Sequence, residues 1–175
     1  NSMPLIQPFR GLRPLPGHAG DVAAPPYDVL SSAEARERAA GKPLNFLHIS
    51  KAEIDLPVDT DPCSPAVYAK SADNFRRLIA DGVLIRDAAP CYYAYRLTMG
   101  EHVQTGIAAA ASVVDYDSNR IRKHEFTRPD KEDDRVRHIE ATGCQTGPIF
   151  LAYRDDPTLA FLVGAAKEAE PLYDF

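Results

Sequence analysis

The segment Tyr92–Tyr116, YYAYRLTMGEHVQTGIAAAASVVDY, decides the fold class because it carries the strongest strand signal of the chain. Aromatic and β-branched residues in Tyr92–Met99 and His102–Tyr116 flank a Gly-Glu pair of the kind that forms tight turns. The pattern predicts a β-hairpin of two long strands. The second strand is apolar from Ile107 to Val114, so we expect both of its faces to be covered.

Helical signals precede the hairpin. Ser31 or Ser32 is a suitable N-cap, Glu34 lies in the first turn that follows, and Gly41 lies beyond the end, which predicts a short helix. A longer helix is predicted from Pro65 to Ala80, where apolar residues recur at helical spacing. Between these two helices, the apolar run Leu44–Ser50 predicts a buried strand.

The residues after the hairpin alternate between strand and helix signals. We expect strands at Ile121–Phe126 and Pro148–Tyr153, and helices at about Pro129–Ala141 and Thr158–Ala169. Together with the hairpin, these elements predict an α+β fold with a mixed or antiparallel sheet and several flanking helices.

Six prolines crowd the first 26 residues, and none of them can donate a backbone hydrogen bond. They predict an extended proline-rich arm at the N-terminus, packed on the domain. Asn1 and Ser2 precede Met3 and are typical of a cloning scar, so we expect residues 3–175 to form a single α+β domain.

Composition excludes several classes of protein. The 175 residues are 45% hydrophobic and 26% charged, which is typical of a globular domain. The net charge of −5 comes without a basic stripe, so nucleic acid is not an expected partner. We find neither an apolar run of about 20 residues, as a membrane span requires, nor a secretory signal, and we expect a cytoplasmic protein.

Neither the cysteines nor the histidines indicate a metal site. Cys63, Cys91 and Cys144 are an odd, widely spaced set without a C-x-x-C pair, which argues against a disulfide framework and against a zinc site rich in cysteine. The sequence His124-Glu125 lacks the second histidine of a zincin helix, because position 128 is arginine.

The stretch around Glu125 is the strongest candidate site. Glu125 is a candidate general base, and Thr127 is expected to cap the helix that follows, so that the positive end of the helix dipole lies beside Glu125. Such an end favours anions. Within the helix, Lys131 and Arg135 are expected to project from the same side as His138, at a spacing that suits a phosphate or carboxylate.

The same helix has an alternative interpretation as a solvated surface helix. Asp133 with Arg137, and Asp134 with His138, are spaced four residues apart and would pair along the helix surface. Outside this helix the candidate ligand-binding residues are fewer and more dispersed. They are His124 beside Glu125, Asn45 and His48 in the predicted strand, and Arg10, Tyr27 and Asp28 in the arm.

Several blocks in order along the chain resemble one protein family. They are PFRGLRP at Pro8–Pro14, APPYDV at Ala24–Val29, NFLH at Asn45–His48, HEFT at His124–Thr127 with Lys131, Asp134 and Arg135, and PIF at Pro148–Phe150. Separated blocks in a fixed order are more specific than any one of them, and on this basis the chain resembles the DUF1015 family over nearly its whole length.

The resemblance implies that the chain is the N-terminal portion of a longer protein, so that the remaining C-terminal part of its own chain would be a partner. That part carries an Asp-Gly-His-His-Arg box, similar to the nucleotide-binding motif of ParB- and sulfiredoxin-like proteins. By this analogy the family implies phosphoryl transfer to a small hydroxyl metabolite such as free serine, with a nucleotide and Mg²⁺.

Two functions therefore stay open. In one, the protein is a small-molecule kinase or another nucleotide-dependent phosphotransferase, with Glu125 as a base or a metal-binding carboxylate and His124, Lys131 and Arg135 around a phosphate. In the other, the same pocket binds a small anionic metabolite without chemistry. A third possibility is an interaction module that uses the proline-rich arm. The sequence contains neither of the glycine-rich phosphate-binding motifs G-x-x-x-x-G-K-[ST] and G-x-G-x-x-G.

Overall fold

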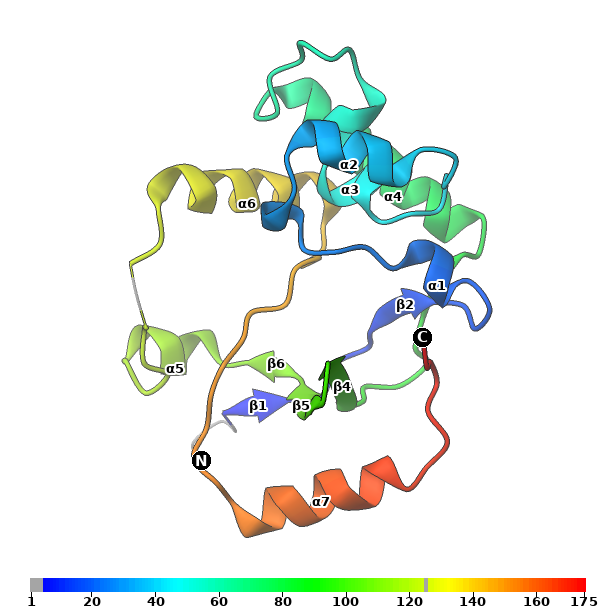
Figure 1. Cartoon of the computed structure of the whole chain (residues 1–175). Helices are drawn as coiled ribbons and strands as arrows, with labels where there is room; N and C mark the ends of the chain where they lie inside the picture. Colours follow the sequence, from blue (N-terminus) through cyan, green and yellow to red (C-terminus); the bar gives the residue numbers. More distant parts are fainter. Residues whose placement is uncertain (1–4, 125) are drawn as a thin grey trace. The chain divides into compact units, whose positions relative to one another are not determined.

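The computed structural model describes residues 5–124 and 126–175, and it confirms an α+β protein with small two-stranded sheets (Figure 1). The chain divides into two compact units. The first lies within residues 1–13, 86–126 and 151–174, and the second within residues 14–85, 127–150 and 175. Two of the boundaries fall inside strands that pair with each other, β2 (Leu12–Pro14) and β3 (Leu84–Arg86).

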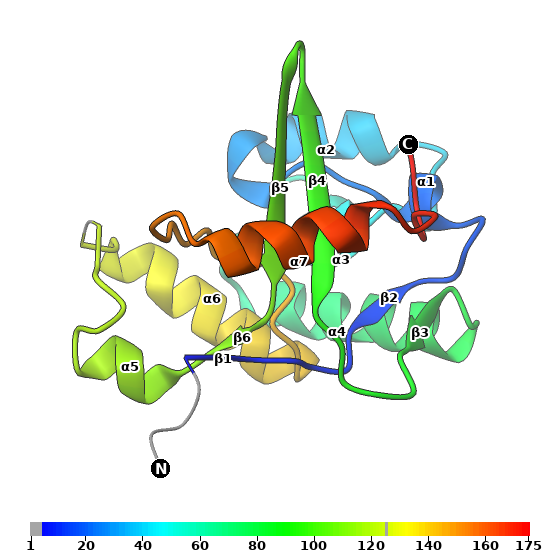
Figure 2. The ribbon, with the colours of Figure 1, turned by 90° about the horizontal axis from the view of Figure 1, so that it is seen from below.

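The first unit contains most of the strands. Its elements are β1 (Ile6–Gln7), β4 (Tyr93–Met99), β5 (His102–Ala108), β6 (Ala110–Ala111), α5 (Val113–Asp117) and α7 (Pro157–Lys167). β4 and β5 form the predicted antiparallel hairpin, closed by a two-residue turn in which Gly100 has a φ of 61°. α7 crosses the hairpin and contacts β4 (Figure 2).

The second unit is mainly helical. Its elements are α1 (Ala19–Val22), the 3₁₀ turn η1 (Tyr27–Val29), α2 (Ser32–Ala39), α3 (Leu47–Ser50), the 3₁₀ turn η2 (Ala52–Asp55), α4 (Pro65–Ala80) and α6 (Pro129–Thr142). α4 packs against α3, η2 and α6. The core beneath α2 is formed by Ala35, Ala39, Leu47 and Ile54.

Two of the predicted helices form because of local signals that the structure confirms. The Ser31 hydroxyl accepts a hydrogen bond from the Glu34 amide, and the Glu34 carboxylate accepts one from the Ser31 amide, which makes a complete capping box at the start of α2. α4 begins with Pro65 in its first turn and ends before Gly82, whose φ is 71°. The buried face of α4 repeats at helical spacing and includes Val67, Tyr68, Ser71, Ala72, Phe75 and Leu78.

Three predicted strands are wrong. Leu44–Ser50 contains the helical turn α3 because Asn45 accepts a hydrogen bond from the Leu47 amide and starts the turn. The described residues of 121–126 form no strand, and neither does Pro148–Tyr153, because no neighbouring strand pairs with them. The predicted strand His102–Tyr116 ends early and continues as β6 and α5.

Candidate functional site

α6 begins at the predicted residue, but its cap is different. The N-cap is Arg128, whose side chain makes no capping hydrogen bond, and the prediction that Thr127 caps the helix is wrong. The Thr127 hydroxyl instead donates to the Glu132 carboxylate at 3.0 Å. α6 ends at Gly143, which adopts the left-handed conformation with a φ of 68°.

Arg135 is held between two partners in the second unit. Its Nε and Nη2 donate to Asp134 Oδ2 at 3.0 and 2.6 Å, and its guanidinium lies 3.8 Å from the centre of the Tyr27 ring. A cation over an aromatic face is attracted by the electron-rich ring. The predicted residues Tyr27 and Arg135 therefore do meet. However, the charge of Arg135 is compensated by Asp134 and one face of its guanidinium is covered.

Tyr68 extends this network to α4. Its hydroxyl donates to Asp134 Oδ1 at 2.8 Å. Burial, followed by this hydrogen bond, raises the pKa of Tyr68. Burial by itself would raise the pKa of Asp134, but the hydrogen bonds from Arg135 and Tyr68 outweigh burial and hold that pKa below its ordinary value. Asp134 is thus a charged anchor between α4 and α6.

His138 is a second anchor between the same helices. The sequence predicted His138 on the charged side of α6, but the residue is only 3% exposed, whereas Lys131 is exposed. Its Nε2 lies 3.0 Å from Ser71 Oγ and 3.1 Å from the Ile49 carbonyl. Burial lowers the pKa of His138, so the ring is neutral near pH 7.

The Ser71–His138 contact is structural. Ser71 is 1% exposed, and its hydroxyl donates to the Ile49 carbonyl at 2.7 Å. A catalytic serine must reach a substrate and donate its proton to the base. Here the serine proton is committed to a carbonyl oxygen in the core. The pair therefore joins α6 to α3 and α4.

Asn45 and His48 use their polar atoms within the fold. Asn45 is 6% exposed and donates to the Ala23 carbonyl at 2.9 Å. The His48 Nδ1 lies 2.8 Å from Asp55 Oδ1, and its Nε2 lies 3.1 Å from the Lys42 carbonyl. These contacts satisfy the backbone around α3 and leave both side chains without a vacant polar atom for a ligand.

The remaining predicted residues do not join a cluster. In the first unit, Arg10 donates to the Asp87 carbonyl at 2.8 Å and His124 is exposed. In the second unit, Asp28 and Lys131 are exposed. Glu125, the predicted base, lies outside the described residues, so its role stays a prediction.

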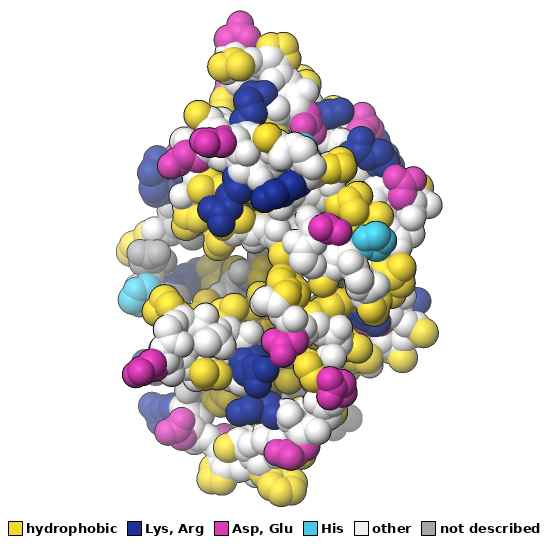
Figure 3. All heavy atoms as spheres, turned by 45° about the vertical axis from the view of Figure 1, so that its right-hand side comes forward, with side chains coloured by type: hydrophobic (Ala, Val, Ile, Leu, Met, Phe, Trp, Pro, Cys, Tyr) yellow, Lys and Arg dark blue, Asp and Glu magenta, His cyan; other side chains and the backbone are white. Residues whose placement is uncertain are grey.

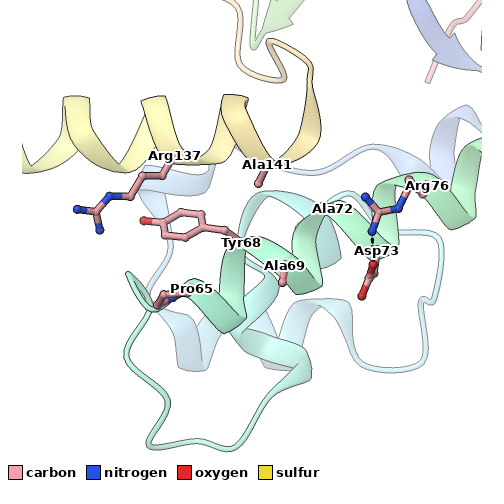
Figure 4. Close-up of a pocket in the computed structure, with 8 residues that line it drawn as sticks. All are labelled: Pro65, Tyr68, Ala69, Ala72, Asp73, Arg76, Arg137 and Ala141. Carbon is pink, nitrogen blue, oxygen red and sulfur yellow. Dashed lines mark hydrogen bonds and ion pairs between the residues drawn. The ribbon is translucent and has the colours of Figure 1, made fainter.

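A pocket of about 510 Å³ lies between α4 and α6 in the second unit (Figure 4). It is open to solvent. Its walls are formed by α4 and α6, the two helices that the Tyr68–Asp134 and Ser71–His138 contacts join. The lining residues are Pro65, Tyr68, Ala69, Ala72, Asp73, Arg76, Arg137 and Ala141. None of the predicted site residues is among them. Tyr68 carries no sequence signal of its own, and the sequence predicted Arg137 only as a partner of Asp133, with which it forms no ion pair in the structure. Only the packing of α4 on α6 brings Tyr68 and Arg137 together.

Two arginines give the pocket its charge, and they differ in their surroundings. Arg76 forms an ion pair with Asp73 three residues before it on α4. Arg137 has no ion-pair partner among the described residues. Figure 4 shows Arg137 at one end of the pocket, on the side of the Tyr68 hydroxyl, and the Arg76–Asp73 pair at the other end. The uncompensated positive charge is therefore at the Arg137 end.

The wider surface mixes both signs of charge. On the face in Figure 3, basic side chains (dark blue) and acidic side chains (magenta) are interspersed. No group of three or more His, Cys, Asp or Glu side chains is placed to hold a metal ion among the described residues. Within 5–124 and 126–175, no helix has the length and apolar character needed to cross a bilayer.

Comparisons with known proteins give one result. A family model described as a protein of unknown function, DUF1015, matches residues 6–175. Neither the search of curated proteins nor the search of solved structures found a match. Three residues from the blocks that carried the resemblance are joined in the second unit, where Arg135 contacts both Tyr27 and Asp134. The match covers nearly the whole chain, and the protein belongs to the DUF1015 family.

Proposed function

We propose that this domain binds a small molecule with an anionic group in the pocket between α4 and α6. One observation carries the proposal. Arg137 stands at the end of a pocket of about 510 Å³ and has no ion-pair partner among the described residues. Pockets for small ligands fall in the range of about 300–1,000 Å³ and have mainly apolar walls with a few polar groups, as this pocket does.

The rigidity of the pocket walls supports the proposal. Asp134 connects α6 to Tyr68, and His138 connects α6 to Ser71 and to the Ile49 carbonyl. Both contacts fix α6 against α4 before any ligand arrives. A site that is already ordered loses less conformational entropy when it binds, so a larger part of the contact energy contributes to affinity.

Phosphoryl transfer, the other function that the sequence left open, lacks a comparable observation. It depends on Glu125, which lies outside the described residues, and on Arg135, which is already paired with Asp134. Lys131 is exposed and is the alternative anchor for an anion on α6. A direct comparison of Lys131 with Arg137 therefore distinguishes the predicted site from the pocket.

Calorimetric titration at fixed ionic strength tests the proposal. The probes are hexanoate, inorganic phosphate and ATP with Mg²⁺, and the variants are Arg137→Gln and the matched control Lys131→Gln. Both substitutions remove one positive charge from α6. We expect at least one anion to bind, with about tenfold weaker affinity in Arg137→Gln, equal to about 1.4 kcal/mol, and little change in the control.

Two results would contradict the proposal. One is that no probe binds the original protein. The other is that Lys131→Gln weakens binding while Arg137→Gln does not. That result would place the binding site at Lys131, on the charged side of α6 that the sequence predicted.

A further inference from the structure

We infer that the ligand of the α4–α6 pocket is a monocarboxylate with an apolar body, and not a phosphate ester or a nucleotide. The inference rests on the proposed function, because it assumes that the pocket is the binding site. It follows from four features of the pocket, namely the charge available to a ligand, the donors beside Arg137, the chemistry of the walls and the placement of the two arginines.

The charge available to a ligand is one positive unit. Asp73 compensates Arg76, which leaves Arg137 as the only lining cation without a counter-ion among the described residues. A single carboxylate neutralises it. A phosphate ester or a nucleotide carries about two or more negative charges at pH 7 and would leave charge uncompensated. A second negative charge on the ligand would have no positive partner among the lining side chains.

The donors beside Arg137 are few. Arginine offers parallel N–H donors that match two oxygens of a carboxylate or of a phosphate. No second donor comes from the nearest phenol, because the single hydroxyl proton of Tyr68 is donated to Asp134. Arg137 can pair with both oxygens of a carboxylate, whereas a third phosphate oxygen would receive no hydrogen bond from the Tyr68 hydroxyl.

The walls are apolar. Between the two arginines the pocket is lined by the Tyr68 ring and by the methyl groups of Ala69, Ala72 and Ala141 (Figure 4). These groups offer no hydrogen bonds, and they favour a ligand body of methylene or aromatic carbon that leaves water on binding.

Figure 4 shows the two arginines at opposite ends of the pocket. Tyr68, on the Arg137 side, and Arg76 are eight positions apart on α4, which corresponds to about 12 Å along the helix axis. A ligand whose carboxylate binds Arg137 therefore extends its apolar body along the alanines toward the Arg76–Asp73 pair.

Matched probes test the ligand class. Hexanoate, its neutral isostere hexanamide, the short acid acetate, inorganic phosphate and ATP with Mg²⁺ are titrated separately at one ionic strength. We expect hexanoate to bind about tenfold or more tightly than each of the other four. In Arg137→Gln, the difference between hexanoate and hexanamide should disappear.

A second pair of variants tests the apolar wall. Ala69→Leu fills the pocket, and Ala66→Leu adds the same atoms at an exposed position of α4 that does not line it. We expect hexanoate binding to weaken about tenfold in Ala69→Leu and to stay unchanged in Ala66→Leu.

The outcomes separate the two proposals. If phosphate or ATP binds more tightly than hexanoate and loses affinity in Arg137→Gln, the inferred ligand class is wrong, but the pocket is still the binding site. If affinity for hexanoate is equal to that for acetate or hexanamide, the apolar or the anionic part of the inference is wrong. If no probe depends on Arg137, both the ligand class and the pocket are wrong.

Discussion

The two units differ in what holds them together. All buried hydrophobic residues among the described part of the chain belong to the second unit, where Leu47 and Ile49 are fully buried. The first unit has none, and it exposes large apolar side chains such as Leu97 at 58% and Phe161 at 74%. Apolar burial is the main favourable contribution to folding, so the second unit contains most of the stabilising core.

The first unit is ordered by a polar cluster at Asp87 instead. Arg13 donates to Asp87 Oδ1 at 2.8 Å, and the Tyr93 hydroxyl donates to Oδ2. The hydrogen bonds from Arg13 and Tyr93 hold the pKa of Asp87 below its ordinary value. Gly11 completes the cluster because its amide donates to the Tyr93 hydroxyl at 2.8 Å. These contacts connect Gly11 and Arg13 to Tyr93 at the start of β4.

The contrast teaches where a binding site is to be sought. A pocket keeps its shape only if its walls are fixed, and α4 and α6 in the second unit are fixed by a core and by two polar anchors. The first unit has no buried hydrophobic residue among its described residues to hold its surface in place. The predictions below test this contrast.

The largest expected effect is a core truncation in the second unit. Leu47→Ala removes a side chain that is 0% exposed, and it should lower the free energy of unfolding by about 2–5 kcal/mol because it leaves a cavity. The matched truncation in the first unit, Leu97→Ala, should change it by less than about 0.5 kcal/mol. Urea titration followed by circular dichroism measures both. Equal losses would mean that the first unit also has a stabilising core.

A smaller effect is expected at Gly11. A Cβ atom there would lie 2.6 Å from the Tyr93 hydroxyl oxygen and 2.9 Å from Cζ, so Gly11→Ala must displace the ring and disturb the Asp87 cluster. We expect a loss of about 1–3 kcal/mol. Gly106→Ala in β5 of the same unit is the control, because nothing lies within 4 Å of its added Cβ. If the two variants unfold at the same urea concentration, the cluster does not support the first unit.

The smallest effect is the pH dependence that His138 gives to the second unit. Because burial lowers its pKa below the ordinary value of 6.5, the unfolded chain takes up a proton first as the pH falls. The contribution of the neutral His138 ring to the free energy of unfolding is fully present above pH 6.5, and it is lost as the pH falls below that value. One such group changes the free energy of unfolding by at most about 1.4 kcal/mol per pH unit.

Urea titrations at pH 7.5 and 5.5 measure this change. In His138→Gln, the difference in unfolding free energy between the two pH values should shrink, because the buried imidazole that resists protonation is gone. His102→Gln, at an exposed position of the hairpin in the first unit, is the control. An unchanged difference in His138→Gln would show that the buried ring is not the source of the pH dependence.

Local signals were sufficient to predict part of the fold. The Ser31–Glu34 capping box, the Pro65 start of α4 and the Gly100 turn each depend on neighbours within a few residues. The strand predictions were wrong where a strand needs a distant segment to pair with. Pro148–Tyr153 has the composition of a strand, but Phe150 is 79% exposed and no strand among the described residues pairs with the segment. A short apolar run does not reveal whether a partner strand exists.

The candidate site was harder to predict, because it depends on which helices meet. The charged face of α6 was visible in the sequence, and the contact between Tyr27 and Arg135 joins two of the predicted residues. The pocket requires that Tyr68 of α4 and Arg137 of α6, 69 positions apart, face one space. His138 was assigned to the wrong side of α6 because helical spacing does not say which side is buried.

Amide chemical shifts in a ¹⁵N–¹H spectrum, followed as hexanoate is added at constant ionic strength, test the central claim most directly. We predict that the largest shifts fall on residues 66–76 of α4 and 137–141 of α6, and that they are lost in Arg137→Gln. Shifts that concentrate in the first unit, or that fall on α6 around Lys131 and persist in Arg137→Gln, would contradict the assignment of the pocket as the binding site.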